Sequence, residues 1–250
     1  MISIVCVYNS EKILNDYLLK NLKNQTVNFE LIDLDNSEGK FKSAAEALNY
    51  GGEKAKGKYI MFVHQDVDLS SNSWLEEVEK MLDELPNLGI AGVAGKKDER
   101  GVMSVIKNGN PPENAGSITI ENPEEVQTLD ECLIIVPKSV FDVLQFDEEV
   151  CDDWHLYAVD YSLSVKKIDF DAYAIPMFIY HRSAGYLFSG KYYLTLKKVL
   201  KKHKKDCKQI YMTMGDWGTL YPLTLQKIWR LAKAGVKILF KIKKIGKTQE

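Results

Sequence analysis

The sequence predicts an α/β fold in which a mostly parallel sheet is flanked by helices. Two observations lead to this expectation. Residues 1–90 alternate short apolar runs with longer segments in which apolar residues recur every three or four positions. Such alternation sets strands side by side in parallel, joined by right-handed helical crossovers. The second observation is size, because 250 residues, 45% hydrophobic and 27% charged, are enough to bury both faces of one such sheet.

The opening elements are justified by their apolar patterns. Residues 2–8, ISIVCVY, form a run typical of a buried strand, and residues 11–25 then carry an apolar stripe at helical spacing. FELIDLD at 29–35 is the second expected strand, and a helix is expected at 43–55. A third strand is expected at 58–64, KYIMFVH, where the apolar run ends in a histidine.

The later elements are less regular. A helix is expected at 73–85, with Ser73 as its N-cap and Glu76 at the capping-box position, and a fourth strand at 89–95. Residues 101–122 contain turn signals typical of a short excursion. The remaining expected elements are a strand at 126–137, a short helix at 138–144, a helix at 152–167 and a strand at 171–181.

Neither a signal peptide nor a membrane span is expected. The start lacks a basic segment before its apolar run, and no apolar stretch reaches about 18 residues. The cysteines Cys6, Cys132, Cys151 and Cys207 are widely spaced, which favours small buried thiols over a disulfide framework or a zinc site. Together these features predict a cytoplasmic protein with reduced cysteines.

The charge is unevenly distributed along the chain. The net charge of −2 divides into +13 for residues 191–250 and −15 for residues 1–190. Two basic segments, 191–208 and 225–247, place lysines among apolar residues at near-helical spacing, which is typical of an amphipathic helix on an anionic membrane. The alternative is that each segment packs its apolar stripe on the main domain. Nucleic acid is not expected as a partner, because no recognition motif accompanies the lysines.

Polar residues follow two of the expected strands. The run VHQDVD places His64, Asp66 and Asp68 directly after an apolar strand, and His181 ends a later one. Grouped carboxylates supply the oxygen ligands that Mg²⁺ and Mn²⁺ prefer, and an imidazole can add a nitrogen. No glycine-rich phosphate loop follows any strand, so a bound phosphate would need a metal ion or side chains to neutralise it. An ordinary solvated loop is the alternative.

Three spaced motifs in residues 1–70 carry more information than composition does. They are ISIVCVYN, LKNQTVNFELIDLDNS and ALNYGGEKAKGKYIMFVHQD. Together they resemble the inverting family-two glycosyltransferases of the GT-A fold, and residues 126–185 match that family more loosely. The resemblance implies transfer of a sugar from a nucleotide-diphosphate donor, with Mn²⁺ or Mg²⁺ on the diphosphate and an acidic residue as base on the acceptor hydroxyl.

Carried over by position, the resemblance implies roles for particular residues. The family's DxD motif falls on His64-Gln65-Asp66, so Asp66 is expected to be the main metal ligand, with His181 as its partner and Asp68 assisting through water. The residues expected to bind the donor are Val7, Tyr8, Asn9, Asp35, Asn36, His64, Gln65 and Arg182. The tandem acids usual after the second strand are reduced here to Asp35-Asn36, which leaves the nucleotide base open, with a UDP-sugar favoured.

The catalytic base stays open at this level. The family's usual base falls on Ala158, which cannot take a proton. Acids and a histidine on the same expected helix are the substitutes, with Asp153 or Asp160 as base and His155 third. Asp152, at the start of that helix, is expected to be its N-cap.

The expected organisation is a GT-A catalytic domain at 1–190, followed by a basic amphipathic helical extension at 191–250. Within the domain, about 1–100 would bind the nucleotide sugar and about 101–190 the acceptor. The expected function is a metal-dependent glycosyltransferase at the inner face of the membrane, acting on a glycan or lipid-linked acceptor in cell-surface polysaccharide synthesis. A nucleotidyltransferase is a weaker alternative, because its glycine-rich first loop is missing. A non-catalytic sugar or nucleotide binder of the same fold is the third hypothesis.

Overall fold

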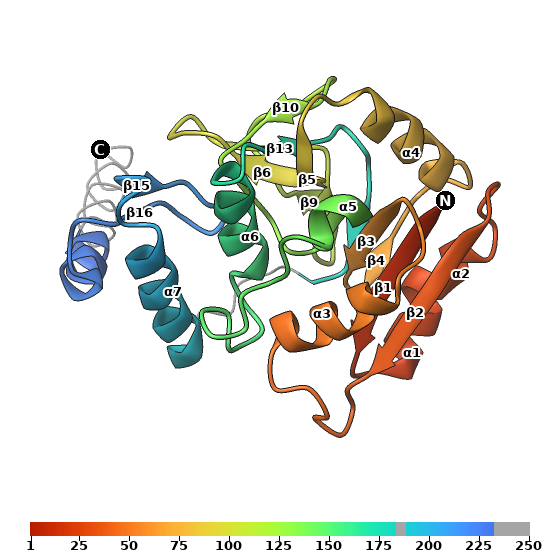
Figure 1. Cartoon of the computed structure of the whole chain (residues 1–250), viewed down its shortest axis with the longest axis horizontal. Helices are drawn as coiled ribbons and strands as arrows, with labels where there is room; N and C mark the ends of the chain where they lie inside the picture. The colour runs from red at the N-terminus through yellow and green to blue at the C-terminus, as the bar shows by residue number, and fades with distance from the viewer. Residues whose placement is uncertain (184–188, 233–250) are drawn as a thin grey trace, which may run out of the picture.

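The computed structural model describes residues 1–183 and 189–232 (Figure 1). Its centre is a seven-stranded sheet. In spatial order the strands are β10 (Glu124–Glu125), β13 (Asp171–Ala174), β5 (Leu88–Gly92), β12 (Leu133–Pro137), β3 (Tyr59–Val63), β1 (Ile2–Tyr8) and β2 (Phe29–Asp35). β1 pairs in parallel with β2 and β3, and β13 with β5, whereas β12 runs antiparallel to both of its neighbours. The expected mostly parallel sheet is therefore confirmed, with β12 and β10 reversed.

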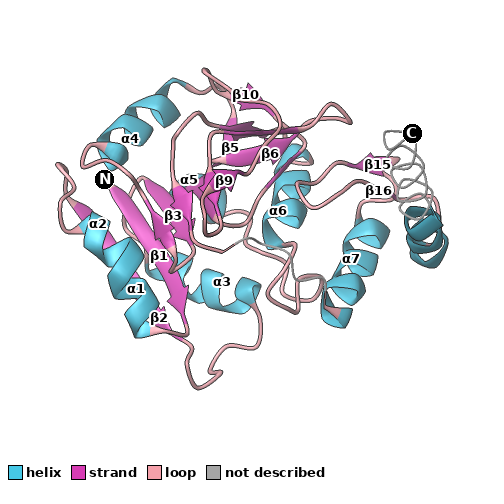
Figure 2. Cartoon of the chain, turned by 180° about the vertical axis from the view of Figure 1, so that it is seen from behind, coloured by secondary structure: helices cyan, strands magenta, loops and turns pink. Residues whose placement is uncertain are grey.

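Helices cover both faces of this sheet (Figure 2). One face packs on α1 (Glu11–Leu14), the π-helical turn Asn15–Leu19, α2 (Lys20–Leu22) and α4 (Trp74–Glu84). The other packs on α3 (Ala44–Lys54), α5 (Lys138–Phe141) and α6 (Tyr157–Lys166). Successive residues of β1 point to opposite faces, so Ile4 joins the first core and Val5 the second. This two-sided burial explains why the strands are continuous apolar runs.

Several element boundaries differ from the sequence-based expectation. The expected strand at 89–95 divides at Val93 into β5 and β6 (Ala94–Lys96), which belong to different sheets. The expected strand at 126–137 likewise divides into β11 (Thr128–Leu129) and β12. Ser73 stands at the N-cap of α4 but makes no capping hydrogen bond, because its hydroxyl donates to Glu77 instead of accepting from the backbone.

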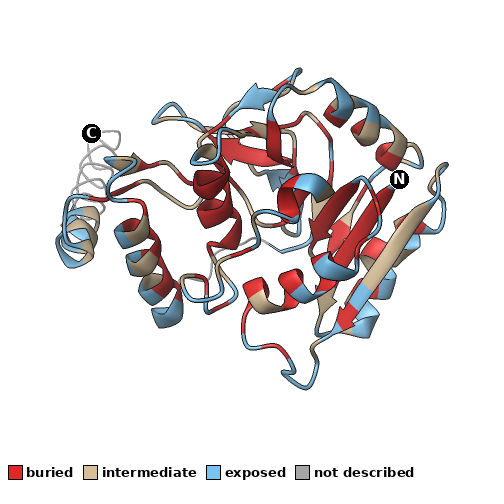
Figure 3. Ribbon diagram, viewed as in Figure 1, coloured by how far each residue is buried: buried red, intermediate tan, exposed pale blue. Residues whose placement is uncertain are grey.

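The helix expected at 152–167 begins only at Tyr157. Leu156 has a φ of 69°, in the left-handed region that α-helices of L-residues exclude, so residues before it cannot continue the helix. Asp152 is therefore not an N-cap, and its carboxylate pairs with Lys198 Nζ at 2.7 Å. α6 is buried along almost its whole length (Figure 3).

Small accessory sheets join the ends of the central strands. β4 (Val67–Asp68) pairs with β14 (Tyr180–His181), which pairs in turn with β8 (Lys107–Asn108) and then β9 (Glu113–Asn114). A second sheet contains β11, β6 and β7 (Val102–Ser104). Because β14 sets His181 opposite Val67, the two strand-end histidines of the sequence become neighbours.

The C-terminal part described lies at the end of the molecule away from the N-terminus (Figure 1). α7 (Gly190–Lys202) packs Tyr192, Leu196 and Val199 on α6, so the first basic segment shares a core with the main domain. The strands β15 (Gln209–Ile210) and β16 (Trp217–Gly218) complete that core. A further helix runs from 223 to the last described residue, 232, and the rest of the expected amphipathic segment 225–247 lies outside the described residues.

Two other expectations can be compared with the described residues. All four cysteines are free thiols, and three of them are buried. In residues 1–183 and 189–232, no helix is both long and apolar enough to cross a bilayer.

Candidate functional site

Three side chains converge where β3 ends. His64 follows β3, with its backbone N–H donating to Cys132 O at 3.0 Å, and Asp66 lies two residues further in the same turn. His181 arrives from β14, and its Nε2 lies 3.2 Å from Asp66 Oδ1. One candidate ligand atom from each of the three lies within 4.8 Å of the others. The sequence-based pairing of the two strand-end histidines around Asp66 is therefore present in the structure.

Asp66 is held in its charged form. Burial opposes ionisation, but the contacts with His181 and Ser183 outweigh it and hold the pKa of the carboxyl well below its usual range. Asp66 Oδ2 accepts hydrogen bonds from the Ser183 backbone N–H, at 3.2 Å, and from the Ser183 hydroxyl. The Arg182 N–H donates to the Asp66 carbonyl at 3.1 Å, which ties the β14 end to this turn. The carboxylate is thus oriented before any ligand arrives.

Hydrogen bonding also fixes the protonation of His64. Burial, and secondarily the neighbouring His181, lower the pKa of His64 to about 4, so the ring is neutral near pH 7. The Tyr157 hydroxyl donates its one proton to the Glu131 carbonyl at 2.9 Å, and its oxygen lies 3.1 Å from His64 Nε2. That oxygen must therefore accept from His64 Nε2–H, which leaves Nδ1 as the unprotonated nitrogen.

The three side chains fit a divalent cation. His181 Nε2 is buried, lies 3.2 Å from Asp66 Oδ1, and has no hydrogen-bond partner of good geometry among the described residues. An orphaned imidazole nitrogen beside an ionised carboxylate and a neutral histidine is the donor set of a metal site. The cluster would offer such a cation two imidazole nitrogens and one carboxylate oxygen.

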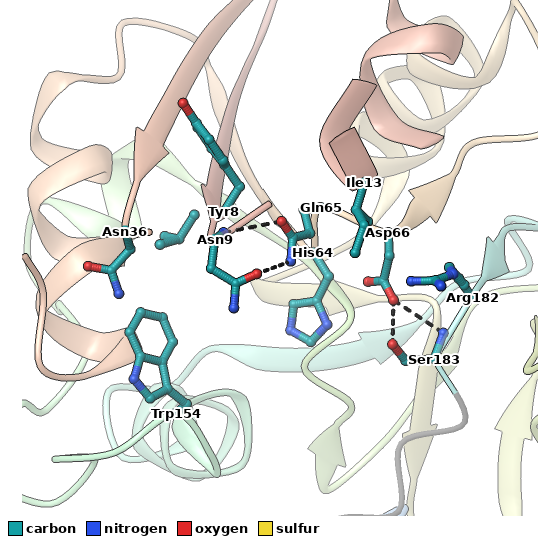
Figure 4. Close-up of a pocket in the computed structure, with 11 residues that line it drawn as sticks. Tyr8, Asn9, Ile13, Asn36, His64, Gln65, Asp66, Trp154, Arg182 and Ser183 are labelled. Carbon is teal, nitrogen blue, oxygen red and sulfur yellow. Dashed lines mark hydrogen bonds between the residues drawn. The ribbon is translucent and has the colours of Figure 1, made fainter. Parts of the chain in front are cut away.

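A cavity of about 430 Å³ opens next to this cluster (Figure 4). Gln65 forms part of its rim: its Oε1 accepts from the N–H groups of Asn9 and Ser10 at 3.2 and 3.1 Å, and its Nε2 donates to Asn9 Oδ1 at 2.8 Å. The loop after β1 is thereby fixed to the turn after β3. The lining residues are Val7, Tyr8, Asn9, Ile13, Asn36, His64, Gln65, Asp66, Trp154, Arg182 and Ser183.

Every residue expected to bind the donor lines this cavity except Asp35. The Asp35 carboxylate instead accepts from the Ser37 N–H at 2.8 Å, within its own turn. Trp154 lies in the cavity wall near Asn36 (Figure 4). Ile13, which also lines the cavity, was not among the residues expected to bind the donor.

A second cavity, of about 820 Å³, shares His64 and Ser183 with the first and is also lined by His181, Glu131 and His155. The sequence reading missed Glu131. β12 runs antiparallel to β3, with Leu133 opposite Val63, so the residues just before β12 lie at the same sheet edge as His64. The sequence signal was the pair of carboxylates Asp130 and Glu131 directly before an apolar run. This pair lies at the sheet edge that carries His64 only because β12 runs antiparallel to β3.

Glu131 is a carboxyl group with a perturbed environment. Burial raises its pKa, and its Oε1 is buried without a hydrogen-bond partner among the described residues. Its Oε2 lies 3.9 Å from His155 Nδ1, and this contact raises the pKa of His155. A raised carboxyl pKa in a cavity is typical of an acid–base group. By contrast, both oxygens of its neighbour Asp130 are occupied, by the Cys132 N–H and the Thr213 hydroxyl.

Three predicted site residues lie elsewhere. Asp160 points from α6 toward α7, where its oxygens contact Lys202 Nζ at 2.7 Å and His203 Nε2 at 2.8 Å. Asp153 lines neither cavity, and its carbonyl accepts from Ala44 N–H at the start of α3. The Asp68 carboxylate accepts from the Ser70 N–H at 2.8 Å and is not part of the metal-type cluster.

We expect Asp160→Ala to lower stability and to leave donor affinity unchanged. The substitution leaves Lys202 and the buried His203 without their shared carboxylate, at a cost of about 3 kcal/mol. Thermal denaturation measures the loss, with Asp142→Ala as the control, since its partner Lys138 is on the surface and the expected cost is under about 1 kcal/mol. Native stability combined with lost turnover would return Asp160 to the list of candidate bases.

Comparisons with known proteins were made for sequence and for structure. A family model described as "Glycosyltransferase like family" matches residues 2–181. No curated protein sequence matches the chain. Three similar solved structures are the mannosyltransferase PcManGT from Pyrobaculum calidifontis with GDP-Man and Mn²⁺, GalNAc-T7 with UDP, GalNAc and Mn²⁺, and S. aureus TarS 1-349 with UDP.

These structures are similar in fold at low sequence identity. The mannosyltransferase has a TM-score of 0.57 at 13% identity, covering 83% of this chain and 65% of its own. GalNAc-T7 has a TM-score of 0.57 at 13% identity, covering 82% of this chain and 47% of its own. TarS has a TM-score of 0.55 at 16% identity, covering 80% of this chain and 64% of its own. The chain spans less than two thirds of the length of each of these proteins.

Proposed function

Since the chain belongs to the glycosyltransferase-like family and has the GT-A fold, we propose that it transfers a sugar from a nucleotide-diphosphate donor to an acceptor hydroxyl. One observation carries the proposal. The cluster of His64, Asp66 and His181 contributes to both cavities, because His64 lines both, Asp66 lines the cavity of about 430 Å³ and His181 lines the cavity of about 820 Å³. A transferase needs this arrangement, because donor and acceptor must meet at one point from two sides.

The smaller cavity is the proposed donor site. Its volume is within the range of small-molecule sites, and its wall combines Asn9, Asn36 and Gln65 amides with the Trp154 ring. Side-chain amides can form hydrogen bonds with the polar groups of a nucleoside, and an aromatic ring can stack on its base. Arg182, at the other end of the cavity near Asp66, would contact the diphosphate (Figure 4). A UDP-sugar is the first donor to test, and a GDP-sugar the second.

A divalent cation bound by His64, Asp66 and His181, with Mn²⁺ favoured, would neutralise the negative charge that develops on the leaving diphosphate. The protein's own part is to hold these three donors in the correct protonation state. His64 is kept neutral with Nδ1 free, and Asp66 is kept ionised by His181 and Ser183. Ser183 would remain hydrogen-bonded to Asp66 Oδ2. This bond would keep Asp66 Oδ1 oriented toward the cation.

Glu131 is the proposed base. It lines the larger cavity together with His64 and His181. We place the acceptor hydroxyl in this cavity, so that it would attack from the face opposite the diphosphate. A single displacement of this kind inverts the anomeric centre. Glu131 takes the place of the family base that Ala158 cannot provide, and its neighbour His155 would orient it. The presence of a carboxyl group that could act as base argues against the hypothesis of a non-catalytic binder.

The reaction is tested by incubating the protein with UDP-glucose, UDP-N-acetylglucosamine and GDP-mannose, and measuring released nucleoside diphosphate with Mn²⁺ or with EDTA. At least one donor is expected to be cleaved, in the Mn²⁺ arm only. Binding of a donor without turnover, in the presence of cell-extracted acceptors, would support the non-catalytic alternative.

Membrane attachment is part of the proposal, at the inner face of the membrane in cell-surface polysaccharide synthesis. Leu225, Ile228 and Leu231 are exposed on the helix that starts at 223, next to Lys227. We expect the double variant Ile228→Ser/Leu231→Ser to float less with vesicles containing phosphatidylglycerol than the wild type. Val143→Ser, an exposed apolar residue on the main domain, is the control and should float normally. Equal flotation of both variants would contradict attachment through this helix.

A further inference from the structure

The wall of the larger cavity combines two chemically different kinds of side chain. The functional groups Glu131, His155 and His181 are one kind. The remaining wall is mostly apolar and comes from separate parts of the chain. Its members include Ile106, Ala115, Leu129, Val159, Met212 and Met214.

The apolar wall is held in place without a ligand. The segment that carries Met212 and Met214 is fixed at Asp216, whose two carboxylate oxygens bind Lys96 Nζ at 2.7 and 2.8 Å. It is fixed again by the Thr213 hydroxyl, which donates to Asp130 at 2.8 Å. Lys96 is itself buried, so this ion pair is shielded from solvent. The cavity is therefore preformed, as small-molecule sites usually are.

Such a wall does not suit a saccharide. Each sugar hydroxyl that is buried needs a hydrogen-bond partner, and an apolar wall supplies none. Of the polar side chains that line the cavity, Thr213 and Asp130 are bonded to each other. An apolar group, in contrast, gains from every contact with Leu129, Val159 and the flexible methionine side chains.

We infer that the acceptor is a lipid-linked molecule whose hydroxyl lies at Glu131 and whose hydrocarbon chain lies along the apolar wall of the larger cavity. This rests on the proposed function, which supplies the donor and the base. It adds the class of the acceptor.

The outer side of the same wall favours a lipid over a soluble aromatic acceptor. The wall segment leads through β16 to the exposed apolar residues Leu220, Tyr221 and Leu225. The helix from 223 is anchored on it, because the Arg230 guanidinium lies 3.6 Å from the Trp217 ring centre and donates to the Asp216 carbonyl. The cavity wall and an exposed surface suited to a bilayer are therefore one connected unit.

The probes for this inference are hexyl, heptyl, octyl and nonyl β-D-glucopyranoside, titrated into the full chain below their micelle concentrations. The head group is constant, so the change in affinity along the series reports on the chain alone. Affinity is expected to rise about threefold to fourfold for each added methylene. An affinity independent of chain length would overturn the inference.

Two variants locate the bound chain. Ala115→Phe puts a much larger side chain on the apolar wall and is expected to abolish the chain-length dependence. Met214→Gln keeps the size of a half-buried side chain but makes it polar, and is expected to weaken nonyl glucoside about tenfold. Ile228→Ser, on the outer surface, should keep the full dependence. If Ala115→Phe and Met214→Gln both behave as wild type, the chain binds elsewhere and the inference is wrong.

UDP binding with Mn²⁺, measured on the same samples, separates this inference from the proposed function. Both cavity variants should bind UDP as the wild type does, because neither residue lines the donor cavity. If the wild type binds UDP normally but shows no chain-length dependence, only the inferred class of acceptor is wrong and the proposed transferase function remains. Chain-length dependence in a protein that binds no nucleotide would overturn the proposed transferase and leave an apolar ligand site.

Discussion

Glu131→Gln is expected to lower kcat by about 10²- to 10⁴-fold while the Kd for donor and Mn²⁺ changes by less than about twofold. Glutamine keeps the size and the hydrogen-bonding capacity of the side chain but cannot take a proton. Steady-state release of nucleoside diphosphate measures kcat, and calorimetry measures Kd. Glu125→Gln is the control, since that carboxylate lies at the far edge of the sheet on Lys166. Wild-type turnover of Glu131→Gln would remove Glu131 as the base.

The pH dependence of turnover is a second test of Glu131 as the base. A base works only when deprotonated, so activity falls as pH drops through its pKa. Because burial raises the pKa of Glu131 above the ordinary 4.5, the acid limb of kcat should lie above pH 4.5. Removing the imidazole by His155→Gln should move that limb, because the two groups are in contact. A limb unchanged in His155→Gln would argue against their coupling.

Asp66→Asn is the prediction with the largest expected effect on binding. The substitution keeps an acceptor for Ser183 but removes the only carboxylate of the cluster, so Mn²⁺-dependent donor affinity should fall by at least about 100-fold. Asp68→Asn is a matched control two residues away, because that carboxylate only accepts from Ser70 N–H. It should bind donor within about twofold of wild type. Equal losses in both variants, or none in either, would contradict the assignment of the metal ligands.

The parts of the fold that were predictable are those in which local pattern and burial agree. β1 and β3 are apolar runs covered on both faces, and the bounds of β1, β2 and β3 match the sequence-based expectation within a residue or two. The reversal of β12 was not predictable, because an apolar run of this length fits either direction. That one reversal brings Glu131 to the site, so the missed strand direction and the missed candidate base have the same cause.

The metal-type cluster was predictable for a different reason. His64 and Asp66 follow an apolar run within one turn, and the family resemblance of the preceding segment indicated their role. Asp160 shows where such reasoning fails. It matches the family's last acid by position, but its environment comes from Lys202 and His203, some 42 and 43 residues away along the chain. No local pattern around Asp160 indicates that its charge is already paired.

The central claim is that the chain binds a nucleoside diphosphate through a cation held by His64, Asp66 and His181. Calorimetric titration of UDP and of GDP into the wild-type protein, in Mn²⁺ and in EDTA, tests it most directly. At least one of the two nucleotides is expected to bind in Mn²⁺, and its binding should be lost in EDTA. Equal affinity in Mn²⁺ and EDTA, or no binding of either nucleotide, would contradict it.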